Sequence, residues 1–302
     1  MTACRHAVAI AALAFAATAA PAVHAGEPAQ RVLGVTVAAS EQTDANGIAT
    51  DTVPSLQPWE AATRARIGVA ATFIAWGSGA DPVAFARAAL ESGETPLITW
   101  ESWVPGTGGA ARPGFANAEI AQGRWDGYVR RVADGLQDLS GTIYIRFDHE
   151  MNGDWYPWHD DPTGYVAAWR HVVDVFRAEG AGNVQWVWAP NAGWTTAGWL
   201  ASVRPYWPGS SYVNWVGLTT QERYEPMAVY ARHLDLINAV WTAKPVMLPE
   251  TNVMTLPYMR AFVGFVLPRP WIRLVTWYER PGFGTLLARP LLAAAFGRLS
   301  AR

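Results

Sequence analysis

Acidic and aromatic residues crowd the stretch from Ile143 to Trp158, which reads Ile-Tyr-Ile-Arg-Phe-Asp-His-Glu-Met-Asn-Gly-Asp-Trp-Tyr-Pro-Trp. Its first half is typical of a short strand, and its second half changes to the residues of a tight loop. Because strand side chains alternate between two faces, Arg146, Asp148 and Glu150 are expected to share one face. Charges on one face of a buried strand are costly unless paired, so we expect a polar cluster lining a cavity. The aromatic rings that follow favour a sugar ring as its ligand.

A second carboxylate in a comparable position is Glu250, which ends an apolar run that begins at Val246. By the same alternation Val246, Leu248 and Glu250 share one face, so Glu250 is expected to point inward as Glu150 does. Two glutamates that face each other across a cleft are the minimum machinery for cleaving a glycosidic bond. A salt bridge at the rim is the alternative for any glutamate at a strand end.

Two other hydrolytic chemistries do not fit the spacing. His149 and Glu150 would open an H-E-x-x-H zinc helix, but the chain continues with Asn152-Gly153 where the second histidine is needed. No G-x-S-x-G nucleophile elbow occurs in the sequence. We therefore expect neither a metal nor another cofactor.

Strand patterns alternate with helical patterns along the whole chain. Strands are expected at residues 31–38, 67–76, 96–100, 142–147, 184–189, 213–218, 245–248 and 272–277. Helices are expected at residues 58–66, 81–91, 121–139, 162–179, 197–204, 226–243, 256–267 and 284–299. Eight such units over about 275 residues predict an α/β fold, a single (β/α)₈ barrel. A doubly wound open sheet is the alternative, but the first strand lacks the glycine-rich turn that binds phosphate in that fold.

A barrel would bring the ends of distant strands to one mouth. Active sites of this fold lie at the C-terminal ends of the strands, which places Glu150, after strand four, opposite Glu250, after strand seven. Aromatic and polar residues follow most of the other strands and are candidate substrate contacts. With the loop after strand four, the candidates are Trp100, Glu101, Trp103, His149, Asn152, Trp155, Trp158, Tyr224 and Trp277.

The N-terminus has the features of an export signal. Arg5 and His6 precede an apolar run from Ala7 to Ala20, and small residues precede a cleavage site after Ala25. Residues 1–25 are therefore predicted to be a signal peptide and residues 26–302 one catalytic domain, secreted or periplasmic. A membrane anchor is the alternative, although the run is shorter than the ~20 residues of a spanning helix.

Composition is that of a globular domain. Of 302 residues 51% are hydrophobic, and the net charge of −2 gives no attraction for nucleic acid. The single cysteine, Cys4, lies within the predicted signal, so the mature chain must depend on its core instead of disulfides. We expect a monomer.

The run from Arg146 to Trp158 resembles the acid/base motif of glycoside hydrolase family 26, which comprises retaining (β/α)₈ enzymes best known as β-mannanases. Five further segments match that family in order: Pro96-Leu-Ile-Thr-Trp-Glu101, Gly123-Arg-Trp-Asp126, Trp186-Val-Trp-Ala-Pro-Asn191, Val213-Asn-Trp-Val-Gly-Leu218 and Lys244-Pro-Val-Met-Leu-Pro-Glu250. The resemblance implies that Glu150 is the acid/base and Glu250 the nucleophile. It also implies that His149, Trp155 and Trp277 contact the sugar or orient the glutamates.

One segment departs from the family. After strand six the family usually carries Asp-Gly-Tyr, whose tyrosine hydrogen-bonds the nucleophile, whereas this chain has Thr219-Thr220-Gln221 with Tyr224 three residues later. Either Tyr224 substitutes for that tyrosine or the nucleophile lacks this partner. The resemblance implies an endo-β-glycosidase of β-1,4-mannan or a related β-linked polysaccharide. The alternative is a weak or inactive barrel that only binds envelope polysaccharide or exopolysaccharide.

Overall fold

Parallel strands form one closed sheet in the computed structural model, which describes residues 30–37, 53–104, 114–193, 198–279 and 285–300. The strands are β1 (Val32–Thr36), β2 (Ile67–Ala75), β3 (Thr95–Glu101), β4 (Ile143–Phe147), β5 (Val184–Trp188), β6 (Trp215–Gly217), β7 (Thr220–Gln221), β8 (Val246–Asn252) and β9 (Ile272–Tyr278). They pair in the order β6-β5-β4-β3-β2-β1-β9-β8, and β6 pairs with β8 to close the ring. Because β7 follows β6 after two residues and also pairs with β8, the two occupy one barrel position. The predicted (β/α)₈ barrel is confirmed, and the expected strands seven and eight are β8 and β9.

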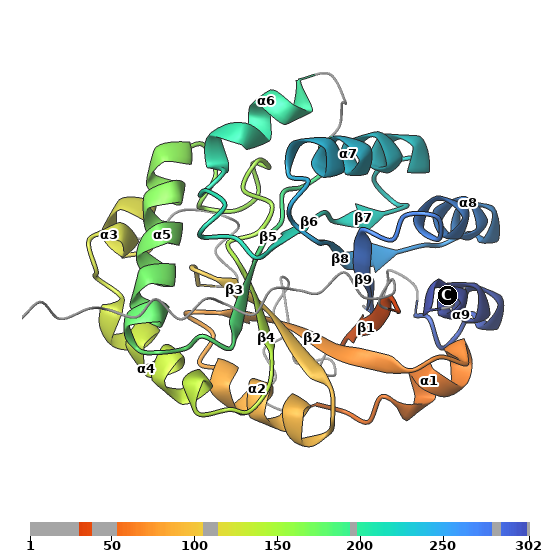
Figure 1. The fold of residues 1–302 in the computed structure, drawn as a ribbon, viewed down its shortest axis with the longest axis horizontal. Helices are drawn as coiled ribbons and strands as arrows, with labels where there is room; N and C mark the ends of the chain where they lie inside the picture. The colour runs from red at the N-terminus through yellow and green to blue at the C-terminus, as the bar shows by residue number, and fades with distance from the viewer. Residues whose placement is uncertain (1–29, 38–52, 105–113, 194–197, 280–284, 301–302) are drawn as a thin grey trace, which may run out of the picture.

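Helices surround the barrel (Figure 1). They are α1 (Gln57–Thr63), α2 (Pro82–Glu91), α3 (Asn117–Ala121), α4 (Asp126–Gln137), α5 (Pro162–Ala178), α6 (Trp199–Val203), α7 (Met227–Val240), α8 (Leu256–Val266) and α9 (Pro290–Gly297), with 3₁₀ turns η1 (Arg204–Tyr206) and η2 (Arg298–Ser300). Asp81 and Asp161 cap α2 and α5 by accepting hydrogen bonds from Val83 N and Gly164 N, and a proline takes the first helical position of each. The helix expected at 121–139 is α4, and the short helix α3 precedes it as a separate element.

Two apolar layers hold the barrel together. The larger lies between the strands and the helices, and the smaller fills the barrel interior with Val69, Ala71, Leu97, Val187, Ala189, Met247 and Leu274. Gly34 of β1 is required here, because a Cβ would lie 2.9 Å from Val69 Cβ and 3.0 Å from Thr276 Oγ1. The interior is therefore packed with small and branched side chains, as is usual in this fold.

Arg31 stabilises the contact between β1 and β9, which we call the seam. Its guanidinium is buried and donates hydrogen bonds to the carbonyl oxygens of Ile272 (2.8 Å), Leu299 (2.9 Å), Val266 (3.0 Å) and Arg269 (3.1 Å). These carbonyls belong to β9, η2, the end of α8 and the segment between α8 and β9. One side chain thus joins the start of the barrel to its last elements.

Two predictions concern the N-terminal segment and membrane insertion. The predicted signal peptide, residues 1–25, lies outside the described residues. Among the described helices, none combines the length and apolar composition needed to cross a membrane.

Candidate active site

The backbone turns sharply at the end of β4. Asp148 has φ 38° and Glu150 has φ 54°, the left-handed region that residues other than glycine seldom adopt. Strand alternation therefore stops at Phe147. The Asp148 carboxylate accepts hydrogen bonds from Ser102 N (2.8 Å) and Ser102 Oγ (2.7 Å) at the end of β3, and burial raises the pKa of Asp148 to about 7. The prediction that Asp148 joins Arg146 and Glu150 on one face is wrong.

Glu250 reaches the interior by an irregularity of β8. Met247 faces the barrel interior, whereas Val246 and Leu248 pack in the outer apolar layer. The pairing register of β8 with β9 then shifts between Leu248 and Thr251. Glu250 does meet the interior residue Arg146, but the expected shared face with Val246 and Leu248 is wrong, because a register shift separates them.

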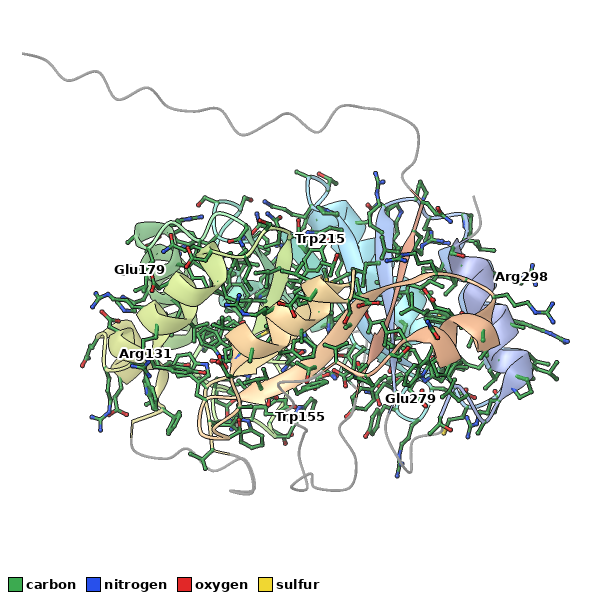
Figure 2. All side chains as sticks on the ribbon, turned by 90° about the horizontal axis from the view of Figure 1, so that it is seen from below. Arg131, Trp155, Glu179, Trp215, Glu279 and Arg298 are labelled. Carbon is green, nitrogen blue, oxygen red and sulfur yellow. The ribbon has the colours of Figure 1, made fainter. Side chains whose placement is uncertain are left out.

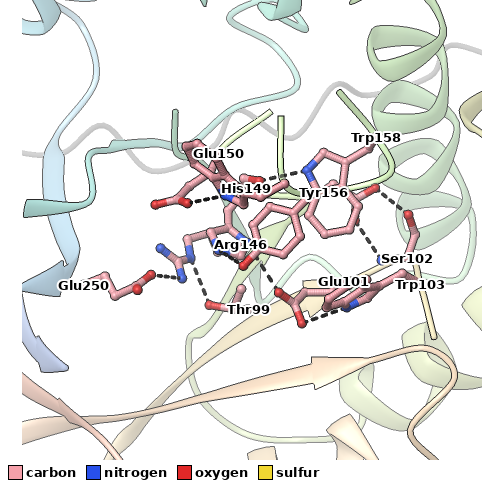
Figure 3. A network of polar contacts seen from close by, with 12 residues as sticks. Thr99, Glu101, Ser102, Trp103, Arg146, His149, Glu150, Tyr156, Trp158 and Glu250 are labelled. Atoms are coloured by element: carbon pink, nitrogen blue, oxygen red, sulfur yellow. Dashed lines mark hydrogen bonds and ion pairs between the residues drawn. The ribbon is translucent and has the colours of Figure 1, made fainter. Parts of the chain in front are cut away.

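Both oxygens of Glu250 accept hydrogen bonds. Gln221 Nε2 donates to Oε1 (2.9 Å). Arg146 Nη2 donates to Oε2 (2.8 Å), and Arg146 Nε donates to Thr99 Oγ1 (2.9 Å) (Figure 3). Tyr224 is 51% exposed, whereas the Gln221 amide is buried against Glu250. Gln221, and not Tyr224, therefore supplies the side-chain donor after β6.

Both oxygens of Glu150 are held in the same manner. Trp155 Nε1 donates to Oε2 (2.9 Å) and Asn191 Nδ2 donates to Oε1 (2.9 Å). Asn152, a predicted substrate contact, instead pairs with the backbone of Asn191, accepting from its N–H (2.8 Å) and donating to its carbonyl (2.9 Å). The loops after β4 and β5 thus fix the Glu150 carboxylate together.

The two glutamates lie close together at the barrel mouth. An oxygen of Glu150, an oxygen of Glu250 and a ring nitrogen of His149 all lie within 4.8 Å of one another. These atom types also suit a metal ion, but every carboxylate oxygen of the pair already accepts an N–H, and the Arg146 cation contacts Glu250. These hydrogen-bond donors therefore suit a pair of carboxylates better than they suit a site for a metal cation.

Most of the aromatic residues predicted to contact substrate instead hold other side chains of the site in place. Trp158 stacks on Tyr156 with ring centroids 4.4 Å apart, and its Nε1 donates to the His149 carbonyl (2.8 Å). Trp103 Nε1 donates to Glu101 Oε2 (3.2 Å). Trp155 remains 36% exposed, and Figure 2 places it at the same edge of the molecule as Glu279, at the end of β9. Trp155 is thus the tryptophan of the set best placed to meet a ligand.

The side chains of Trp100 and Trp277 point outward from the barrel strands, toward the helices. Trp100 is buried beside α4, where its Nε1 donates to Tyr128 Oη (3.1 Å), and Trp277 packs against Phe296 of α9 at a centroid distance of 5.5 Å. Neither side chain has exposed surface. Their predicted contact with substrate does not fit these positions, because both rings face the helices.

Four neighbours of the glutamates were not among the candidates: Arg146, Tyr156, Asn191 and Gln221. Arg146 carried a usable signal, since its inward face on β4 required a buried carboxylate as partner. Gln221 marks the departure after strand six, but the sequence does not show that its amide donates to Glu250. Asn191 ends a segment that matches the family.

Known proteins resemble this chain in sequence and in fold. The model of glycosyl hydrolase family 26 matches residues 111–255, which include both glutamates. Over these residues, just under half of its length, the chain is similar to glycoside hydrolase family 26. One known relative, Endoglucanase H of Acetivibrio thermocellus, is 32% identical over 161 residues, 51% of this chain and 17% of that protein. Mannan endo-1,4-beta-mannosidase A and B of Caldalkalibacillus mannanilyticus is 31% identical over 126 residues, 37% of this chain and 23% of that protein. The chain therefore spans only about a fifth of these relatives' lengths.

Solved structures of family 26 share the barrel. A β-mannanase from Bacteroides ovatus superposes with a TM-score of 0.64 at 20% identity, covering 90% of this chain and 88% of that one. A modular endo-β-1,4-mannanase from Cellulomonas fimi gives a TM-score of 0.66 at 16% identity, covering 91% and 71%. At these identities the likeness establishes the fold.

Proposed function

We propose that this protein is a retaining endo-β-glycosidase of family 26 in which Glu250 is the nucleophile and Glu150 the acid/base. The observation that carries the proposal is the approach of the two carboxylates, whose nearest oxygens lie within 4.8 Å at the barrel mouth. Retaining pairs are separated by about 5–5.5 Å and inverting pairs by about 6.5–9.5 Å, because an inverting pair must leave room for water. The short separation supports direct attack by one carboxylate.

The proposed reaction has two displacements. In the first, a Glu250 oxygen bonds to the anomeric carbon, the glycosidic bond breaks, and the Glu150 proton passes to the leaving oxygen. In the second, water attacks the anomeric carbon and gives its proton to the Glu150 carboxylate, and the ester to Glu250 breaks. Arg146 and Gln221 hold Glu250 in place, while Trp155 and Asn191 orient Glu150.

A β-1,4-linked mannan is the proposed substrate, and export through the predicted signal at residues 1–25 is part of the proposal. The names of two relatives and of several solved structures refer to mannan, and another relative is named as an endoglucanase. The exposed Trp155 indole beside Glu150 offers an apolar face for a sugar ring.

The experiment compares Glu150→Ala and Glu250→Ala on natural and activated substrates. Purified protein is first screened on mannan, glucomannan, lichenan, β-1,3-xylan and bacterial exopolysaccharides. Glu150→Ala should lose roughly 10²- to 10⁴-fold on the polysaccharide, because proton donation is lost, but much less in the first step with an activated aryl glycoside. Azide should then yield a glycosyl azide of retained configuration.

Glu250→Ala should not regain activity on an activated substrate or form a glycosyl azide of retained configuration, because the atom that forms the covalent bond is gone. Equal losses for both variants on every substrate, with no azide product of retained configuration, would overturn the assigned roles. Binding of a polysaccharide without turnover by the wild-type protein would instead favour the alternative of a binding barrel.

A further inference from the structure

Asn191, which donates to Glu150 Oε1 through its Nδ2 (2.9 Å), is itself held by several contacts. Its Oδ1 accepts from Gly193 N (2.7 Å), which fixes the rotation of the amide. Its backbone carbonyl accepts from Asn152 Nδ2 (2.9 Å) and from Trp199 Nε1 (2.8 Å), so both lone pairs of that oxygen are used. Asn152 lies in the same loop as Glu150, whereas Trp199 belongs to α6, one of the surrounding helices (Figure 1). Trp199 is therefore the contact that ties this amide to a separate element.

The Trp199 indole is in turn held by a histidine. The ring of His233, on α7, stacks on the indole with centroids 4.4 Å apart and an interplanar angle of 20°. Both side chains are buried, with Trp199 3% and His233 0% exposed. Helix α6 has only five residues and no side-chain cap at Gly198, so it has little stability of its own. The stack on α7 therefore supports the orientation of the indole.

His233 offers the site a ring face and no hydrogen bond. Neither its Nδ1 nor its Nε2 has a hydrogen-bond partner among the described residues, although buried polar groups are normally satisfied. Burial, and secondarily Arg232, lowers the pKa of His233 to about 4, so the ring is uncharged near neutral pH. Stacking on Trp199 is thus the contact through which His233 can affect the site.

We infer that Trp199 is a positioning residue that acts through the Asn191 amide on the proposed acid/base, Glu150. His233 holds the Trp199 indole in the orientation that this requires. The inference rests on the proposed glycosidase function and extends it to two residues on the surrounding helices.

The chemical step that depends on this support is proton transfer. Negative charge develops on Glu150 as its proton passes to the leaving oxygen, and the Asn191 N–H stabilises that charge. The other donor, Trp155, is 36% exposed, so Asn191 is the donor to Glu150 that the interior of the protein holds in place. Loss of the Trp199 N–H should therefore impair proton transfer by Glu150 and leave attack by Glu250 intact.

The test compares Trp199→Phe with a matched control on the polysaccharide found in the screen and on an activated aryl glycoside of the same sugar. Trp199→Phe keeps a ring for the stack but removes the N–H. Its kcat/KM should fall about 5- to 20-fold on the polysaccharide, where the leaving group needs a proton. The rate of its first step on the aryl glycoside should change less than about twofold, because that leaving group needs little protonation.

Trp169→Phe is the control. Trp169 on α5 is also buried, and its Nε1 donates to another backbone carbonyl, that of Tyr212 (3.0 Å). Its substitution removes a comparable hydrogen bond away from Glu150 and should change the kinetics on both substrates by less than about twofold. Equal losses on both substrates for Trp199→Phe, or losses on the polysaccharide no larger than those of Trp169→Phe, would overturn the inference.

Substitutions of His233 test the stack independently, even if Trp199→Phe does not fold. His233→Phe retains a flat ring and should stay within about twofold of wild type, whereas His233→Ala should show the substrate dependence expected of Trp199→Phe. Identical kinetics of the two His233 variants would contradict the role of the stack. A wild-type protein that cleaves no glycan would refute the proposed function and the inference with it, whereas an active wild type with an unaffected Trp199→Phe would refute the inference alone.

Discussion

Glu250 is anchored by two donors of different charge. The Arg146 cation stabilises the negative charge of the carboxylate, and the neutral Gln221 amide fixes its second oxygen without adding charge. Gln221 is itself held by Tyr230, whose hydroxyl accepts from Gln221 N (3.0 Å) and donates to Gln221 O (2.8 Å). A glutamine can therefore perform the orienting function that the family assigns to a tyrosine.

Gln221→Ala should lower kcat by about 10- to 100-fold with a small change in KM, because one hydrogen bond to a charged nucleophile is lost. Tyr224→Phe, which removes only the hydroxyl of a half-exposed side chain, should stay within about twofold of wild type. Steady-state kinetics on the substrate found in the screen measure both. A large kcat loss in Tyr224→Phe with none in Gln221→Ala would return the orienting role to the tyrosine.

Strand and helix patterns in the sequence predict the barrel, because the spacing of apolar residues in each element follows from its packing against the two apolar layers. Alternation failed only at the ends of β4 and β8, where the site is built. Nothing in the types of Asp148 and Glu150 indicates positive φ values, which are held by surrounding contacts, and the shift after Leu248 depends on pairing with β9. The proposed catalytic glutamates are recognisable from their motif, but the geometry of their neighbours requires the tertiary structure.

Aromatic residues were the weaker part of the site prediction. A tryptophan at a strand end suits both a sugar platform and the layer beneath the helices, and the sequence does not distinguish them. Trp155 and Trp100 illustrate this ambiguity, since the first is partly exposed beside Glu150 and the second is fully buried.

Helix α9 packs on α1 through a glycine. A Cβ added at Gly297 would overlap the carbonyl of Thr63, which is backbone and has little freedom to move. Gly297→Ala should therefore lower the free energy of unfolding by about 2–4 kcal/mol. Gly264 in α8 is the matched control, because no atom lies within 4 Å of an added Cβ. Gly264→Ala should stabilise by about 0.5–1 kcal/mol. Urea denaturation measures both, and similar values for the two variants would refute this account of the α1–α9 contact.

Arg31 acts on the whole molecule because its four acceptors lie 235 to 268 residues away in the chain. Arg31→Ala should lower the free energy of unfolding by about 3 kcal/mol or more, since three buried carbonyls and one partly buried carbonyl lose a charged donor. Arg31→Lys, a single ammonium, should recover only part of this. The exposed Arg87 of α2 provides a control, and Arg87→Ala should change stability by less than about 0.5 kcal/mol. Equal midpoints in urea for the Arg31 and Arg87 variants would show that the seam does not limit stability.

The pairing of β1 with β9 also determines when the fold can be completed during synthesis. β1 leaves the ribosome first of all the strands, yet its second neighbour, β9, and every acceptor of Arg31 belong to residues made at least 235 positions later. Until then β1 has an unpaired edge that is open to incorrect pairing with other chains. During synthesis the sheet thus remains incomplete until β9 and the end of α8 arrive beside Arg31.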